Sequence, residues 1–188
     1  MLQHPFNLGV GAAIRTGIRH ANEEGYSRVI QIDADGQHDP SDAARLLDQL
    51  DHEFDLVVGS RFAGDHPAPY EVGIARRASM RLLARVASRH ANATITDATS
   101  GFRAFGPAAL EVFGAYYPTA YLSDTVEALL IGGDAGLRVC EEPVSMHQRQ
   151  GGTPSARPLR SLLYLIRLNL VILVHRRRTP PRTRAGRS

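Results

Sequence analysis

The feature that most constrains the fold is a regular alternation of short apolar runs with amphipathic segments. Strands are predicted at residues 28–33, 55–59 and 137–144, with a short strand-and-turn segment at 96–105. Helices are predicted at 10–24, 40–50, 74–90, 107–113 and 122–132. This alternation is typical of an α/β domain whose mostly parallel sheet is flanked by helices. Ligands of such sheets bind beyond the carboxyl ends of the strands, which directs attention to the loops at 33–40 and 61–73.

Two carboxylates and an amide follow the first predicted strand directly. Asp33 and Asp35 are separated by one residue, and Gln37 follows in the same polar loop. Oxygen donors placed in this way suit Mg²⁺ or Mn²⁺, which bind through one or two carboxylates together with waters and substrate phosphates. An acidic pair at a strand end can also be a solvated turn. The apolar strand before it, Gln37 and the loop arginines favour a site for a metal-bound diphosphate.

Every one of the 22 basic side chains is arginine, which excludes chemistry that needs a lysine of this chain, such as a P-loop or a Schiff base. Guanidinium groups bind phosphate through paired hydrogen bonds. The candidate phosphate-binding residues on loops and at the start of a helix are Arg61, Arg76, Arg77, Ser79 and Arg149. Each arginine alone is more often a surface residue. As a set around the loop that holds Asp33, Asp35 and Gln37, which we call the carboxylate loop, they favour phosphate binding.

Other chemical signatures are weak. The glycines of the segment 7–11 follow no predicted strand, and Ile14 stands where a third glycine would be needed, so a dinucleotide site is not expected. Ser100 lacks the surroundings of a hydrolase nucleophile. Cys140 is expected to be a small core residue. His38 adjoins the carboxylate loop and is expected either to support that loop or to be solvated.

The basic excess lies at the end of the sequence. Residues 176–188 are expected to form a disordered arginine-rich tail, and the rest of the chain carries more acidic than basic side chains, so nucleic acid is not an expected partner. Residues 158–175 are predicted to form an amphipathic helix whose apolar stretch is shorter than the roughly 20 residues that span a bilayer. Its flanking arginines favour a helix on a membrane surface over a core helix.

Five short motifs occur in an order that resembles family-2 glycosyltransferases, and among them the dolichyl- or polyprenyl-phosphate sugar synthases. They are Asn-Leu-Gly-Val-Gly at 7–11, Asp-Ala-Asp-Gly-Gln-His-Asp-Pro at 33–40, Gly-Ser-Arg-Phe at 59–62, Asp-Ala-Thr-Ser-Gly-Phe-Arg at 97–103 and Arg-Gln-Gly-Gly-Thr-Pro-Ser at 149–155. The resemblance implies a GT-A-like domain over residues 1–157. It also implies that the nucleotide-binding strands which begin this domain are missing before residue 7, so an incomplete nucleotide pocket and poor stability are expected.

The function implied by the resemblance is transfer of a sugar, with inversion, from a nucleotide-sugar to a polyprenyl phosphate. Such an enzyme would be cytoplasmic and peripheral, on the cytoplasmic face of the membrane. Asp33, Asp35 and Gln37 would hold Mg²⁺ or Mn²⁺ on the donor diphosphate. The acceptor phosphate would be held by Arg61, with Arg76 or Arg77, and by Ser79; Arg149 would close over the donor phosphates, and Asp97 would support the site.

Three residues are predicted to be catalytic: Asp35, Arg61 and Asp124. A phosphate acceptor is mostly ionised near neutral pH, because its second pKa is about 6, and it needs no protein base. A hydroxyl acceptor would need one, and Asp124 is then the candidate, although it can also cap the helix that follows. The alternative hypothesis is a non-catalytic, membrane-associated fragment or remnant of such an enzyme that binds anionic lipid or a partner.

Overall fold

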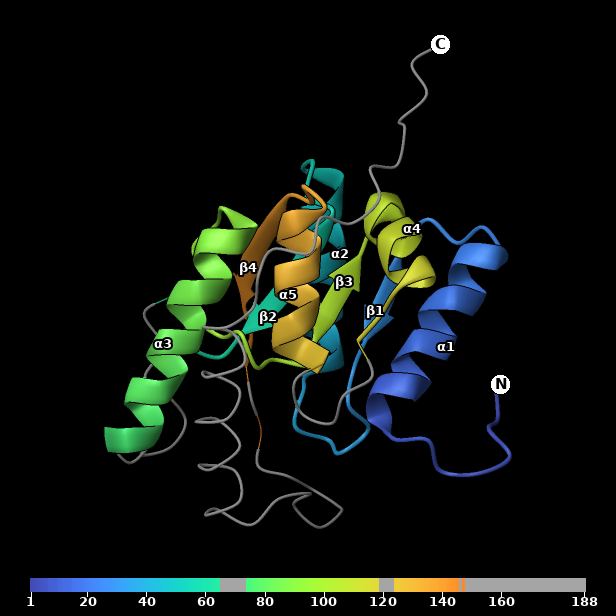
Figure 1. The fold of residues 1–188 in the computed structure, drawn as a ribbon, viewed down its shortest axis with the longest axis horizontal. Helices are drawn as coiled ribbons and strands as arrows, with labels where there is room; N and C mark the ends of the chain where they lie inside the picture. Colours follow the sequence, from blue (N-terminus) through green and yellow to red (C-terminus); the bar gives the residue numbers. More distant parts are fainter. Residues whose placement is uncertain (65–73, 119–123, 146, 148–188) are drawn as a thin grey trace.

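A four-stranded mixed sheet forms the centre of the computed structural model (Figure 1). The structure describes residues 1–64, 74–118, 124–145 and 147. The strands are β1 (Val29–Gln31), β2 (Leu56–Ser60), β3 (Arg103–Phe105) and β4 (Val139–Pro143), and they lie in the order β1-β3-β2-β4.

The direction of β3 decides which loops meet. β2 and β4 pair in parallel, whereas β3 pairs antiparallel with both β1 and β2. The α/β prediction is confirmed, with three strands pointing one way and β3 running against them. The amino end of β3 therefore lies at the same sheet edge as the carboxyl ends of the other three strands.

The helices agree with the predicted segments to within a few residues, as is usual for helix ends. They are α1 (Val10–Glu23), α2 (Pro40–Asp51), α3 (Ile74–Ala91), α4 (Pro107–Ala115) and α5 (Asp124–Asp134). Proline stands at the first position of α2 and of α4, where its missing N–H costs nothing. Asp39 caps α2 by accepting a hydrogen bond from the Ser41 N–H at 2.8 Å.

The two faces of the sheet carry separate apolar cores. Side chains alternate along β2, so that Leu56 and Val58 face α1, α3, α4 and α5, whereas Val57 faces α2. Leu46 of α2 packs with Val57 on that second face, and both side chains are fully buried. The described residues thus form three layers, with four helices on one face of the sheet and α2 on the other (Figure 1).

Helices α3 and α5 come into backbone contact at one glycine. A Cβ on Gly133 of α5 would overlap the carbonyl group of His90 near the end of α3. Only glycine permits this approach, because every other residue carries a Cβ. The contact fixes the position of α3, the helix that carries Arg77 and Ser79, against the helical layer.

Two predicted segments, the amphipathic helix 158–175 and the tail 176–188, lie outside the described residues. Every helix that the structure describes is too short or too polar to cross a bilayer. The incomplete nucleotide pocket and the poor stability remain predictions.

Candidate functional site

The candidate site lies where the loops after β1 and β2 meet the loop before β3. Asp33 follows β1, Arg61 follows β2, and Asp97 belongs to the segment that leads into β3. The carboxylate of Asp33 lies against Gly101, where an added Cβ would be 3.3 Å from Asp33 Oδ2. The antiparallel course of β3 thus brings together groups that are up to 68 positions apart in the sequence.

Arg61 is held by a buried carboxylate. Its Nη2 donates hydrogen bonds to Asp97 Oδ1 at 2.7 Å and to Thr99 Oγ1 at 2.9 Å, and its Nε donates to Asp97 Oδ2. The backbone N–H of Arg61 also donates to Asp97 Oδ2, at 3.3 Å. Asp97 is 1% exposed. This bidentate pair fixes the plane of the guanidinium and its place at the sheet edge.

Glu141 of β4 supports the segment that carries Asp97. Its Oε1 accepts hydrogen bonds from the backbone N–H groups of Thr96 and Asp97, both at 2.8 Å, and its Oε2 accepts one from the Thr96 hydroxyl at 2.7 Å. Sequence reasoning missed this residue. The available signal was a pair of acidic side chains, Glu141 and Glu142, inside a predicted strand.

The buried position of Glu141 predicts a pH dependence of stability. Burial raises the pKa of its carboxyl above the ordinary value of 4.5, although the hydrogen bonds from the Asp97 N–H and from Thr96 act in the opposite direction. The unfolded chain has the ordinary pKa, so the contribution of Glu141 to stability is fully present below pH 4.5 and is lost as pH rises through the folded-state pKa. Glutamine resembles the protonated form, so Glu141→Gln should gain stability relative to the parent as pH rises.

Urea unfolding of the parent and Glu141→Gln across this pH range measures the difference. Glu23→Gln is the matched control, because Glu23 is exposed on α1 and its change should stay within about 0.5 kcal/mol. A stability difference between the parent and Glu141→Gln that is independent of pH would contradict the prediction.

The half-buried His38 follows the carboxylates in the same loop. Its ring packs on Phe102 with the ring centroids 4.8 Å apart. Burial lowers the pKa of His38, and the charges of Asp33 and Asp35 act in the opposite direction. Both carboxylates are therefore within electrostatic range of one imidazole. Asp35 Oδ1 accepts a hydrogen bond from the Gln37 N–H at 3.0 Å, which closes the turn between them.

The donor set of this loop fits a hard divalent cation. Asp33, Asp35 and Gln37 offer only oxygen ligands, the type that Mg²⁺ and Mn²⁺ prefer. In the described part of the chain, no group of three or more His, Cys, Asp or Glu side chains is placed to bind a metal. A cation held by this loop would therefore take its remaining ligands from water and from a bound phosphate.

The segment after β4 closes over the carboxylate loop. The N–H of His147 donates to the Gln37 carbonyl at 2.8 Å, and the N–H of Ser145 donates to Asp42 Oδ2 at 2.8 Å. Sequence reasoning did not single out His147. Arg149, two residues further along, lies outside the described residues.

The remaining residues that are predicted to bind phosphate lie at the start of α3. Arg77 is exposed in its first turn, and Ser79 is half-buried. The side chain of Arg76 is outside the described part of the structure. Whether these residues bind phosphate remains a prediction.

Asp124 lies in a different cluster. It begins α5, is 3% exposed, and accepts a hydrogen bond from the Thr125 N–H at 3.0 Å. Burial raises the pKa of Asp124, whereas Arg103 on β3 lowers it. Among the described residues, no hydrogen bond or ion pair joins Asp124 to the carboxylate loop. Its role as a base remains a prediction.

Comparison with known proteins agrees with the motif order. The family model described as glycosyl transferase family 2 matches residues 1–113. A UDP-N-acetylglucosamine–dolichyl-phosphate N-acetylglucosaminyltransferase of Methanococcus voltae is 30% identical over 145 residues, which is 76% of this chain and 57% of the relative.

Two bacterial relatives show the same pattern. The polyprenol monophosphomannose synthase of Mycolicibacterium smegmatis is 36% identical over 111 residues, covering 55% of this chain and 38% of the relative. The undecaprenyl-phosphate mannosyltransferase of Micrococcus luteus is 28% identical over 150 residues, covering 77% and 59%. The chain spans about half the length of the curated relatives it matches.

Proposed function

Because the chain belongs to glycosyl transferase family 2, we propose that it transfers a sugar from a nucleotide-sugar to a polyprenyl phosphate, with inversion and with a divalent cation. The names of the relatives, which act on dolichyl, polyprenol or undecaprenyl phosphates, support this acceptor class. The observation that carries the proposal is the meeting of Asp33, Asp35 and the Arg61–Asp97 pair at one sheet edge.

On the donor side, Asp33, Asp35 and Gln37 would hold Mg²⁺ or Mn²⁺ against the diphosphate. The cation supplies positive charge where the leaving diphosphate becomes more negative. The neutral imidazole of His38 adds no charge that would compete with it, because burial lowers the pKa of His38. Arg149, on the segment after His147, is proposed to add a guanidinium to the same phosphates.

On the acceptor side, Arg61 would position the lipid phosphate, with Arg76 or Arg77 and Ser79. An acceptor oxygen attacks the anomeric carbon as the bond from that carbon to the diphosphate breaks on the opposite face, which inverts the configuration. The attacking phosphate is already ionised near neutral pH, so no protein base has to take a proton. Asp97 would act on this step only through Arg61, by holding its guanidinium in one orientation.

The proposed acceptor carries a lipid chain, so the reaction is expected at a membrane. We place the protein at the cytoplasmic face as a peripheral protein, in accord with the absence of a membrane-crossing helix among the described residues. The proposed partners are the nucleotide-sugar, the polyprenyl phosphate and the membrane surface, without nucleic acid.

The test is transfer of labelled sugar from UDP- and GDP-sugars to a polyprenyl phosphate in detergent, with and without a chelator. Transfer is expected with Mg²⁺ or Mn²⁺, should stop with the chelator and should return when the metal is added back. The anomeric configuration of the lipid-linked product should be opposite to that of the donor. Vesicle binding together with neither transfer nor metal-dependent binding of these donors would favour the non-catalytic alternative. Transfer that is unaffected by the chelator would contradict the cation.

A further inference from the structure

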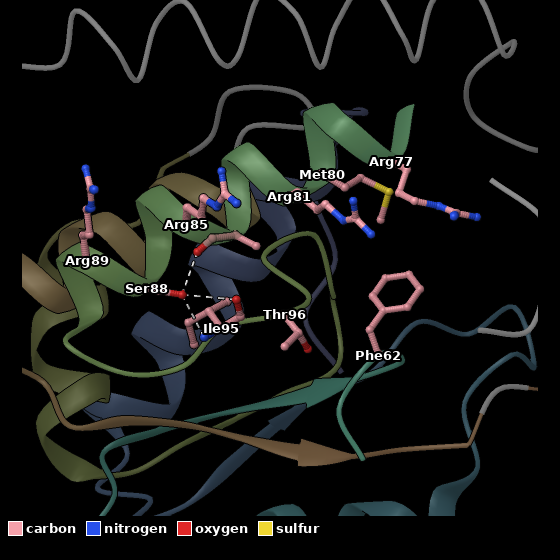
Figure 2. Close-up of a pocket in the computed structure, with 10 residues that line it drawn as sticks. Phe62, Arg77, Met80, Arg81, Arg85, Ser88, Arg89, Ile95 and Thr96 are labelled. Carbon is pink, nitrogen blue, oxygen red and sulfur yellow. Dashed lines mark hydrogen bonds between the residues drawn. The ribbon is translucent and has the colours of Figure 1, made fainter. Parts of the chain in front are cut away.

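A groove runs along α3, beside the candidate site, and no step of the proposed reaction uses most of it. It has a volume of about 860 Å³ and is lined by α3 on one side and by Phe62, Ile95 and Thr96 on the other (Figure 2). Phe62 and Thr96 are sequence neighbours of the Arg61–Asp97 pair, so the groove opens next to that pair. We call it the α3 groove.

Four arginines of α3 line this groove. Arg77, Arg81, Arg85 and Arg89 follow each other at intervals of four residues, about 6 Å apart along the helix axis (Figure 2). All four are exposed. Like charges four residues apart on a helix repel each other. An unfavourable row of this kind indicates that the four arginines bind an anion.

Among the described residues, no carboxylate neutralises the row. Helix α3 contains no acidic residue, and in the part of the chain that the structure describes none of the four arginines pairs with a carboxylate. The sequence after Glu142 has no acidic residue either. Within the described part of the chain, the charge of the row is thus open to an anion of another molecule.

The floor of the groove indicates the kind of molecule. Met80 and Ala84 of α3 and Ile95 of the loop at 95–96 also line the groove, and the lining is mostly apolar. A free phosphate would leave this apolar surface in water, and a nucleic acid would meet one aromatic ring, that of Phe62. A molecule that joins an anionic head to hydrocarbon covers both parts.

We propose that the α3 groove binds an anionic membrane phospholipid, with its phosphate on the arginine row and the first carbons of its chains against Met80, Ala84 and Ile95. This lipid site extends along α3 from Arg77, where it adjoins the proposed acceptor site, and it would hold the acceptor site at the bilayer surface. The inference does not depend on the proposed transfer reaction, because lipid binding and transfer are measured separately.

The test is sedimentation of the full chain with vesicles of phosphatidylcholine, alone or mixed with phosphatidylglycerol. Arg81→Gln/Arg85→Gln should weaken partitioning onto the phosphatidylglycerol vesicles roughly tenfold or more. Arg15→Gln/Arg19→Gln is the matched control, because it removes the same charge at the same spacing from exposed positions of α1 and should change partitioning less than about twofold. Met80→Gln, which keeps every charge, should weaken partitioning several-fold.

Three results would overturn the proposal. The first is equal loss in the α3 and α1 double variants, which would mean that only net charge matters. The second is unchanged binding by Met80→Gln, which would mean that the apolar floor is not used. The third is that Arg81→Gln/Arg85→Gln keeps vesicle binding but loses either self-association or binding of polyprenyl phosphate in detergent. Loss of self-association would mean that the groove binds a second copy of the chain, and loss of polyprenyl phosphate binding would mean that it binds the acceptor.

Discussion

Replacing Asp35 by asparagine is expected to lower the rate of sugar transfer by roughly 100-fold or more, with the fold intact. Asparagine keeps an oxygen that can accept the hydrogen bond from the Gln37 N–H, so the turn should persist. The change removes one of the two negative charges that would hold the cation on the donor diphosphate. Binding of UDP or GDP, measured by calorimetry with Mn²⁺, should be lost in parallel.

Asp48→Asn is the matched control for Asp35→Asn. Asp48 is exposed on α2, so the same loss of charge should leave both nucleotide binding and transfer unchanged. Urea unfolding should place both variants within about 1 kcal/mol of the parent. Metal-dependent nucleotide binding of parental strength by Asp35→Asn would remove the carboxylate loop from the proposed donor site.

Replacing Asp97 by asparagine should have the largest effect on stability, a loss of about 3–5 kcal/mol in the free energy of unfolding. The side chain of Arg61 is 17% exposed and that of Asp97 is fully buried, so the variant leaves a mostly buried guanidinium without its carboxylate. An amide group at this position would also direct N–H donors toward the donors of Arg61. Urea unfolding measures the loss, and transfer should fall because Arg61 is no longer held in one orientation.

Two further variants separate the buried charge from general damage. Asp51→Asn breaks the Arg28–Asp51 pair, whose side chains are 49% and 63% exposed, and should cost less than about 1 kcal/mol. The double variant Arg61→Met/Asp97→Asn should be more stable than Asp97→Asn alone, because no unpaired charge remains. If the changes in unfolding free energy caused by Arg61→Met and Asp97→Asn simply add in the double variant, the ion pair does not contribute to stability.

The parts of the fold that depend on local patterns were predicted from the sequence. Helix α1 was expected at residues 10–24 and lies at Val10–Glu23, because its apolar period and Gly25 act within a few residues. The positions of Asp33 and Arg61 directly after strands were predicted in the same way. Strand ends are marked by local changes in polarity, and these residues follow such changes.

The parts that depend on distant neighbours were not predicted. The sequence does not reveal that β3 runs antiparallel between β1 and β2, since three residues carry too little pattern to fix a direction. Arg103 is fully buried in that short strand, where its Nε donates to the Ser100 carbonyl at 2.9 Å. Glu141 was missed for the same reason, because its partners at 96–97 lie 44 and 45 positions away in the sequence.

The strand order has a consequence for how the protein is made. The partner of β1 in the described sheet is β3, so β1 cannot pair until the ribosome has released residues 103–105. β2 likewise pairs first with these three residues of β3 and then with β4, which is synthesised last. The nascent chain therefore exposes the apolar surface of both strands through much of its synthesis, a situation that favours slow folding and recruitment of chaperones. Because β3 also brings the loops of Asp33 and Arg61 together, the pairing of β3 and the approach of these two loops are one event.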